Sequence, residues 1–519
     1  MIITIKHRFF RGLLIYTETL KKYFNLSSFR TGQLEIINTI ISKNDALAVL
    51  PTGGGKSLCY QFPAFYLQEL VIVISPLIAL MKDQVAGLKK QGLAAGCLHS
   101  GQSESDKRFV FQQMNNSKAF LLYLSPERVQ KEGFQKWILD RKIGLFAIDE
   151  AHCVSQWGHD FREEYAQLKI LKNLRPDVPI LALTASATPT VLNDIAKNLE
   201  LKNPKRSVYG FYRSNLYYQV EHCENEDLKA DWINQALIQN PHGRIIIYCG
   251  TRKITEELSQ QLSQKYENVG FYHAGLSTSE RTQTQDNYVR GTLRILVATN
   301  AFGMGIDQPD VRLVIHYQLP ANIDSLYQEM GRAGRDNAFS TCLMLYSKKD
   351  KGLQSFFIQN SPANKAIKDS RWKNLEALIS YSESSECRHA EILTYYKDSQ
   401  RITHCGHCDI CSPKSNRKIV EPKFKIILKK ALTKKTQTKT KYDETLTPPQ
   451  EKRFQALRQW RKHKAVELDV PAFVIFGDLT LRELAKKNPS QKPQLSSIYG
   501  IGEAKLEKFG EDLLKVLLI

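Results

Sequence analysis

The sequence predicts an α/β protein with two parallel-sheet lobes in tandem, followed by smaller helical units. The main observation is that short apolar runs, separated by helix-like segments, occur in two series. The first series lies at 46–50, 71–74, 119–123, 145–148 and 180–183, and the second, after a linker near 200–215, lies at 244–248, 294–298 and 313–317. Runs that are apolar throughout are typical of parallel strands, because helices cover both faces of such a sheet. Each series therefore predicts one lobe.

Polar residues directly follow several of these runs. They include Ser75, the pair Asp149 and Glu150, and the stretch 184–186. Ligands of open α/β sheets bind outside the carboxyl ends of the strands. These residues therefore fall where an active site is expected.

Length and charge limit the kind of protein. At 519 residues the chain is too long for one core, so two to four domains are expected. We find no apolar stretch long enough to span a membrane and no clean signal peptide, so we expect a cytoplasmic location, nucleoid-associated if the source is bacterial. A net charge of +20 favours a polyanionic partner, of which nucleic acid is the commonest.

The stretch 50–57 is the strongest single motif. It follows the first apolar run and places three consecutive glycines before Lys56 and Ser57. Glycines let backbone N–H groups point inward as a nest for phosphates, Lys56 would reach the β- and γ-phosphates, and Ser57 would bind Mg²⁺. Leu50 stands where the usual pattern begins with glycine. Taken alone, the stretch therefore leaves a glycine-rich turn with a solvated lysine as the alternative.

Two further groups indicate nucleotide chemistry. The Gln33 amide carries both a donor and an acceptor, which matches the edge of adenine. Asp149 could hold Mg²⁺, and Glu150 could orient and deprotonate an attacking water. The alternatives are an exposed helix glutamine and a pair of solvated carboxylates. The phosphate loop upstream favours the nucleotide interpretation of both.

The second series has no phosphate loop but offers Gln328, Arg332 and Arg335. The two arginines are three residues apart, so they lie on one side of a helix or turn. Guanidinium groups stabilise a phosphoryl transition state, and an arginine finger contributes a factor of roughly 10³–10⁵ in rate. A pair of surface salt bridges is the alternative, but the small residues between the arginines favour the finger.

Four of the ten cysteines lie between residues 387 and 411. Two C-x-x-C steps share Cys408, which brings Cys405, Cys408 and Cys411 within reach of one ion, and Cys387 could supply the fourth ligand. A closed set of four cysteines predicts structural Zn²⁺. A redox pair and an iron–sulfur cluster are the alternatives. The six scattered cysteines are expected to be small buried residues.

Taken in order, these motifs resemble those of superfamily 2 helicases. The matching stretches are 50–57, 149–152, 184–188, 299–307 and 328–335. Three more stretches resemble the RecQ family of DNA helicases in particular: a nucleotide-reading motif at 29–33, a first DNA-contact motif at 75–84 and an aromatic-rich loop at 152–162. The resemblance covers nearly the whole chain from about residue 17.

The resemblance implies two RecA-like lobes, a small helical zinc-binding module and an α-helical HRDC-like domain. Implied catalytic residues are Lys56, Asp149, Glu150, Gln328, Arg332 and Arg335. ATP and Mg²⁺ would be held by Arg30, Gln33, Thr52, Gly53, Gly54, Gly55, Lys56, Ser57, Asp149 and Asp307. Zn²⁺ would be held by Cys387, Cys405, Cys408 and Cys411. Nucleic-acid contacts would come from Ser75, Gln84, His152, Trp157, Phe161 and Arg162.

The aromatic-rich loop has a particular expected role. Its aromatic and basic side chains would sense single-stranded DNA and report to His152 beside them, since stacking of one base on an aromatic ring contributes roughly 1–3 kcal/mol. Core positions for Trp157 and Phe161 are the alternative. The polar neighbours of these residues argue against a packed interior.

The expected domains are an N-terminal extension, two lobes, a zinc module, a basic linker and a helical domain, at 1–16, 17–207, 208–346, 347–413, 414–449 and 450–519. Residues 414–441 contain eleven Lys or Arg and one acidic residue, as in an arm on phosphate backbone or a solvated linker. About 38 residues, 412–449, separate Cys411 from the helical domain. That is too few for the winged-helix domain of RecQ proteins, whose hairpin helps to part the strands. In the helical domain, the Gly-x-Gly turn within 498–506 could hold a DNA phosphate, with a protein-contact bundle as the alternative.

The function implied by the resemblance is an ATP-dependent helicase that moves 3′ to 5′ on single-stranded DNA and unwinds duplexes in recombination and repair. One alternative is a DNA-stimulated ATPase that acts as a translocase, clamp or annealing factor without strong unwinding. Another is an RNA remodeler. We expect a monomer without membrane contact, whose partners are single-stranded and partly duplex DNA, single-strand-binding protein and other repair factors.

Overall fold

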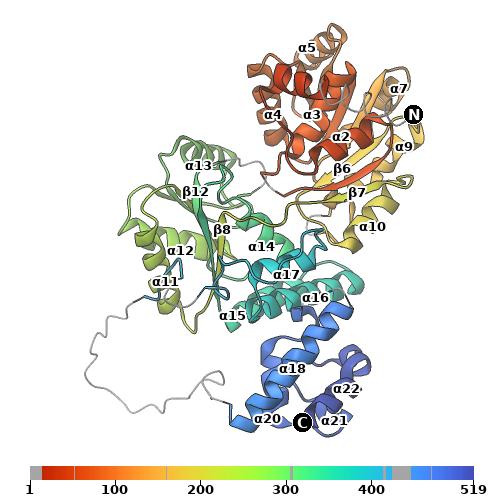
Figure 1. Cartoon of the computed structure of the whole chain (residues 1–519). Coiled ribbons are helices and arrows are strands. Elements are labelled where there is room, and N and C mark those ends of the chain that lie inside the picture. The colour runs from red at the N-terminus through yellow and green to blue at the C-terminus, as the bar shows by residue number, and fades with distance from the viewer. Residues whose placement is uncertain are drawn as a thin grey trace.

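In the computed structural model, shown in Figure 1, the described residues are 15–51, 53–158, 161–303, 308–412, 417–422, 446–468, 470 and 472–518. Several expectations lie outside these ranges: Thr52, Asp307, nearly all of the N-terminal extension and most of the basic linker. The chain forms two α/β lobes, a helical module on the second lobe and a separate helical bundle beyond it (Figure 1).

The first lobe is a parallel sheet in the order β3-β4-β2-β5-β6-β1-β7. Its strands are β1 (Ala46–Val49), β2 (Leu70–Ile74), β3 (Ala95–Leu98), β4 (Phe120–Leu124), β5 (Ile143–Ile148), β6 (Ile180–Thr184) and β7 (Lys205–Val208). The main helices around it are α2 (Gln33–Ile41), α3 (Lys56–Leu67), α4 (Ile78–Lys90), α5 (Glu104–Asn115), α7 (Glu132–Leu139) and α10 (Pro189–Asn198). Shorter helical turns are α6 (Pro126–Val129), η1 (Ala151–Val154), α8 (Glu163–Ala166), η2 (Gln167–Lys169) and α9 (Ile170–Leu174).

Alternate residues of the strands belong to different cores. In β1, Leu47 and Val49 pack in one hydrophobic cluster, whereas Ala46 and Ala48 pack in another. Because successive side chains of a strand point to opposite faces, this division means that helices cover both sides of the sheet. The uniformly apolar runs in the sequence have this cause.

Strand β7 corrects one expectation. It lies within the predicted linker near 200–215 and ends one residue beyond the predicted boundary of the first lobe. It pairs only with β1, at the sheet edge, and both Lys205 and Arg206 are exposed. An edge strand needs no continuous apolar run, so its hydropathy did not predict it.

The second lobe repeats the architecture in the order β10-β11-β9-β12-β13-β8, again with every pair parallel. Its strands are β8 (Leu216–His222), β9 (Arg244–Tyr248), β10 (Val269–Tyr272), β11 (Ile295–Ala298), β12 (Val311–His316) and β13 (Ser340–Tyr346). Its helices are α11 (Glu226–Gln239), α12 (Arg252–Ser263), α13 (Thr278–Arg290) and α14 (Ile323–Met330). The prediction of two parallel-sheet lobes is confirmed.

Helices α15 (Lys348–Gln359), α16 (Lys365–Ser382) and α17 (Arg388–Tyr395), with the cysteine loop after them, pack beside the second lobe (Figure 1). The C-terminal bundle has a core of its own and consists of α18 (Pro448–Glu467), α19 (Ala472–Ile475), α20 (Asp478–Lys487), α21 (Lys492–Leu495) and α22 (Glu503–Leu517). It contacts α16 through the rings of Phe473 and Tyr381, whose centroids lie 5.9 Å apart. None of the helices in the described ranges has the length and apolar character needed to cross a bilayer.

Candidate functional site

The phosphate loop lies between the end of β1 and the start of α3. Gly53 and Gly55 have φ angles of 80° and 77°, a left-handed conformation that glycine adopts without strain. The N-terminus of α3 has no side-chain cap, so its first N–H groups are suited to an anion. Leu50, the departure from the usual motif, is buried and donates its N–H to Thr184 O at 3.1 Å. At position 50 the backbone is still hydrogen-bonded to the neighbouring strand, so this position does not need the conformational freedom of glycine, and leucine is accommodated.

Gln33 and Arg30 support this loop from α2 and the turn before it. Gln33 is 1% exposed, and its Nε2 donates to Gly55 O at 2.9 Å and to Gly54 O at 3.3 Å. Its Oε1 accepts from Arg30 N at 2.7 Å, and the Arg30 guanidinium donates to Gly53 O. The structure thus assigns both residues a role in shaping the loop that the sequence alone did not indicate. Contact of these residues with adenine stays a prediction.

The acidic pair lies at the end of β5, beside the loop. Burial, and next the charge of Glu150, raise the pKa of Asp149, while Lys56 opposes the change. A raised pKa means that the ionised carboxylate is unfavourable in this buried position, and a bound divalent cation would stabilise its charge. Asp149 therefore fits the expected Mg²⁺. Glu150 has a φ of 50°, unusual for a residue with a side chain and typical of strained functional positions.

His152 connects the acidic pair to the neighbouring strand. Its Nδ1 lies 3.3 Å from Glu150 Oε2 and 3.0 Å from Thr184 Oγ1. Burial, with the charges of Lys56 and Arg162, lowers the pKa of His152 to about 3, so the ring is neutral. It is only 2% exposed. The ring is thus enclosed inside the site, and a role of His152 in nucleic-acid binding stays a prediction.

The second lobe brings three side chains to this region. Gln328 Nε2 donates to Ser186 Oγ across the cleft at 3.2 Å, and Ser186 belongs to the stretch 184–186 that was expected near the active site. Arg335 lies against the phosphate loop, with its Cγ 3.6 Å from where a Cβ on Gly53 would be. The Arg332 guanidinium instead donates to Gly303 O of its own lobe. The two arginines thus point to different partners despite their spacing.

The predicted DNA-contact residues are only partly accessible. Trp157 is 39% exposed and Phe161 is half-buried, and both line one cleft, so the alternative of a core position for Trp157 is excluded. Arg162 Nη1 donates to Pro76 O at 3.3 Å. Ser75 is 2% exposed directly after β2, and a DNA contact by this residue stays a prediction.

Gln84 lies in the second turn of α4, the helix that follows Ser75. It is half-buried, and its Oε1 accepts from Gln61 Nε2 at 3.2 Å. This bond ties α4 to α3, which begins at the phosphate loop. A DNA contact by Gln84 stays a prediction.

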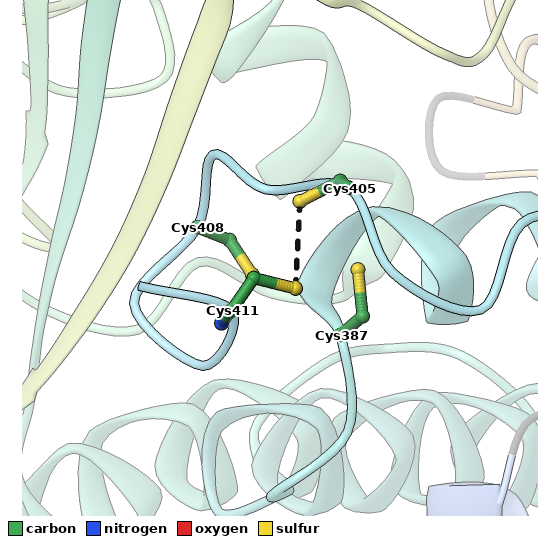
Figure 2. A group of neighbouring side chains, drawn as sticks. All are labelled: Cys387, Cys405, Cys408 and Cys411. Atoms are coloured by element: carbon green, nitrogen blue, oxygen red, sulfur yellow. Dashed lines mark hydrogen bonds between the residues drawn. The ribbon is translucent and has the colours of Figure 1, made fainter. Parts of the chain in front are cut away.

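The four clustered cysteines lie between the start of α17 and the loop 405–411 (Figure 2). Their sulfur atoms all lie within 4.8 Å of one another, and Cys405 Sγ is 3.8 Å from Cys411 Sγ. A tetrahedral ion with Zn–S bonds of about 2.3 Å separates its sulfurs by about 3.8 Å, so the geometry fits Zn²⁺. His389 and His407 form a second group with Cys405, but the four thiols alone complete a structural site.

The cysteine loop is bonded to the edge of the second lobe. Asp409 N donates to Tyr218 O at 2.9 Å on β8, and Asp409 accepts two bonds of 3.0 Å from the buried Arg388 guanidinium. Such a bidentate pair is stronger and more directional than a single bond. An ion held by the cysteines would therefore stabilise the strand at the edge of this sheet.

Comparison with known proteins identifies the family. Sequence profiles match a DEAD/DEAH box helicase at residues 30–195, a helicase conserved C-terminal domain at 228–337, a RecQ zinc-binding unit at 348–412 and an HRDC domain at 450–517. The chain is 33% identical to an ATP-dependent DNA helicase RecQ of Haemophilus influenzae, over 96% of this chain and 95% of that protein. The chain belongs to the RecQ family.

Other relatives agree with this assignment. A RecQ helicase of Bacillus subtilis is also 33% identical, over 96% of this chain and 97% of that protein. Among solved structures, Saccharomyces cerevisiae Dbp5 bound to RNA and ADP BeF3 has a TM-score of 0.52 at 19% identity, over 68% of this RecQ-family chain and 91% of that chain. At that identity the likeness shows the fold alone. The predicted fold class of RecA-like lobes, zinc-binding module and HRDC-like domain is confirmed.

Proposed function

We propose that this RecQ-family protein hydrolyses ATP in the cleft between its lobes and moves 3′ to 5′ along single-stranded DNA. As a member of this family it is an ATP-dependent DNA helicase. The direction of movement and the role of each residue are our proposal. The direction is proposed from the resemblance to RecQ proteins. The residue roles rest on the split site, in which Arg335 of the second lobe lies against Gly53 of the phosphate loop.

Each side chain has a proposed role at the γ-phosphate. The loop N–H groups and Lys56 hold the phosphates, and Ser57 and Asp149 hold Mg²⁺, which polarises the phosphoryl oxygens when bound. Glu150 orients the attacking water. His152, which bonds to Thr184 at 3.0 Å, in turn positions the Glu150 carboxylate. Arg335 stabilises the charge that develops on the transferred phosphoryl group.

Hydrolysis is coupled to movement through lobe closure in this proposal. Residues on both lobes contact the same nucleotide, so ATP favours the closed arrangement and its products favour the open one. Gln328 and Ser186, 3.2 Å apart across the cleft, keep the lobes in register. The aromatic-rich loop, which bears Trp157, follows the acidic pair directly in the sequence. Binding of DNA to this loop would therefore be coupled to closure of the lobes.

We also propose that Cys387, Cys405, Cys408 and Cys411 bind one structural Zn²⁺ per chain. The proposed domain boundaries are those expected from the sequence, with the first lobe extended to Val208, where β7 ends. A monomeric state, a cytoplasmic location, the role in recombination and repair and the protein partners stay predictions.

Strand separation is the part of the function that most needs a direct test. The zinc-binding match ends at 412 and the HRDC match begins at 450, which leaves a short interval between them. The alignment to the Haemophilus protein also runs over 599 positions, more than the 519 residues of this chain, so that protein has segments that this chain lacks. Both facts support the expectation that the usual winged helix is missing.

The test is unwinding of a duplex with a 3′ single-stranded tail, beside a 5′-tailed duplex and a Glu150→Gln variant. We expect separation of the 3′-tailed substrate only, and loss of that activity in the variant. Unwinding from the 5′ tail would contradict the proposed polarity. DNA-stimulated ATPase without unwinding would mean a translocase or clamp, and stronger stimulation by RNA than by DNA would indicate an RNA remodeler.

A further inference from the structure

A cleft of about 600 Å³ lies between the aromatic-rich loop, the second lobe and the zinc-binding module. Trp157 and Phe161 line it from the first lobe, and Gln318 from the end of β12. Phe357 and Asn374 line it from α15 and α16. Its size is within the range of about 300–1,000 Å³ for binding sites of small ligands. A mononucleotide unit of a nucleic acid would fit in this space.

Two of its walls carry large aromatic side chains that face solvent. Trp157 is 39% exposed, and Phe357 is 43% exposed. Exposed aromatic rings cost solvation free energy, so a pair lining one cleft needs a reason other than packing. Nucleobases have apolar faces that stack on such rings without regard to sequence.

The remaining lining carries amide side chains and two charged side chains. The Gln318 Oε1 accepts from Gly250 N at 2.8 Å, and both residues line the cleft. The Asn374 amide makes no hydrogen bond to any other described residue. Glu329 is an acidic group in the lining, and it is bonded to His316 Nε2 at 2.8 Å. Glu329 is only 8% exposed, and Arg371 adds a basic group to the same lining.

We infer that Phe357 is a DNA-contact residue that forms, with Trp157, a clamp for one nucleobase of the translocating single strand. This inference rests on the proposed function, since it adds a contact to the strand on which the helicase moves. The clamp joins the first lobe to α15 of the zinc-binding module, which packs beside the second lobe. A base held between them would therefore link DNA occupancy to the distance between the lobes.

The chain contains a matched control for this inference. Phe356 is the preceding residue of α15, is 60% exposed and does not line the cleft. Its ring centroid lies 6.1 Å from that of Phe357. Replacing either residue by alanine removes the same number of atoms from the same helix turn, so a general effect on α15 would appear in both variants.

The measurement is the Kd of the full-length protein for a fluorescein-labelled 15-nucleotide dT strand, by fluorescence anisotropy. We expect Phe357→Ala to weaken binding about 5- to 150-fold, which corresponds to roughly 1–3 kcal/mol for one stacked base. Phe357→Trp should restore binding, and Phe356→Ala should stay within about twofold of wild type. Unchanged binding in Phe357→Ala would overturn the inference, and so would equal losses in the Phe356 and Phe357 variants.

A double-mutant cycle tests whether the two rings hold the same base. If they do, Trp157→Ala with Phe357→Ala should lose clearly less than the product of the two single losses. Losses that multiply would assign the rings to different bases and overturn the clamp. The wild-type protein separates this inference from the proposed function: if wild type neither binds dT nor shows dT-stimulated ATPase, the proposed function itself fails. A matching RNA strand that bound tighter than DNA would overturn the assigned ligand.

Discussion

Gln328 of the second lobe donates a hydrogen bond to Ser186 of the first lobe, with 3.2 Å between Nε2 and Oγ. Ser186 follows β6, and Gln328 lies on α14, one residue before Glu329, which lines the cleft between the lobes. The bond therefore connects the nucleotide side of the interface with the proposed DNA side. It identifies a contact whose loss can be measured separately from ATP binding.

Ser186→Ala should reduce DNA-stimulated ATP hydrolysis by up to about tenfold, because one neutral hydrogen bond contributes roughly 0.5–1.5 kcal/mol. Gln328→Ala should reduce it further, since the amide would also be lost from the nucleotide. ATPase assays with saturating dT measure both effects. Equal rates in Ser186→Ala and wild type would show that the bond does not matter for closure.

Lys56→Ala should abolish ATP hydrolysis and leave single-stranded DNA binding within about twofold of wild type. The lysine belongs to the phosphate loop, where its Nζ lies 3.3 Å from Leu50 O, and it is not among the residues that line the cleft. Hydrolysis assays and anisotropy test the two halves of this prediction. Normal hydrolysis in the variant would contradict the assignment of the loop.

Arg335→Ala and Arg332→Ala should have different effects on kcat and on the thermal midpoint. Arg335 lies against the phosphate loop, so its removal should lower kcat by about 10³-fold or more, as for other arginine fingers. The Arg332 guanidinium donates to Gly303 O within its own lobe, so its removal should act through the shape of that loop and also lower the thermal midpoint. Comparing kcat with the thermal midpoint separates the two. Equal loss of kcat at unchanged stability would assign both arginines to the phosphate.

Cys405→Ser should lower the zinc content from about one ion per chain, measured by plasma mass spectrometry. It should also lower the thermal midpoint by roughly 4–8 °C for each 2 kcal/mol lost, because the cysteine loop is bonded to β8. Cys97→Ser is the matched control, since Cys97 is buried in β3, outside the cluster, and should keep its zinc. Loss of zinc in His407→Ala would instead favour the histidine group as ligands.

Stability should depend on pH through Glu383, which accepts a hydrogen bond from Tyr346 Oη at 2.7 Å. Burial raises the pKa of Glu383 to about 7, above the 4.5 of an exposed glutamate. The folded state therefore binds the proton more tightly, and the stability that this gives is lost as pH rises from about 4.5 to about 7.

Glu383→Gln should consequently be more stable than wild type at pH 8, by about 1–3 kcal/mol, with a smaller difference at pH 5. The glutamine oxygen can still accept the bond from Tyr346, so the neutral side chain keeps the contact without the buried charge. Thermal midpoints at the two pH values provide the measurement. A difference that is the same at both pH values would exclude ionisation of Glu383 as the cause.

The apolar pattern of the chain was enough to predict the two-lobe α/β architecture, because strands buried on both faces are apolar throughout, and β9 was predicted with its observed bounds. The sequence also indicated the phosphate loop, the acidic pair and the four cysteines, because each depends on residues that are close in the chain. Strands such as β3, β7 and β10 were missed, since edge strands and short strands carry no continuous apolar run.

The accessibility of each side chain, and its partners across the cleft, became clear from the packing of the folded chain. This packing enclosed His152 and Ser75, separated the partners of Arg332 and Arg335, and brought Phe357 to the same cleft as Trp157, 200 positions earlier in the chain. The reason is physical: local spacing limits backbone conformation, whereas burial and contact depend on how distant elements pack. A split active site depends on such packing, because its residues come from both lobes.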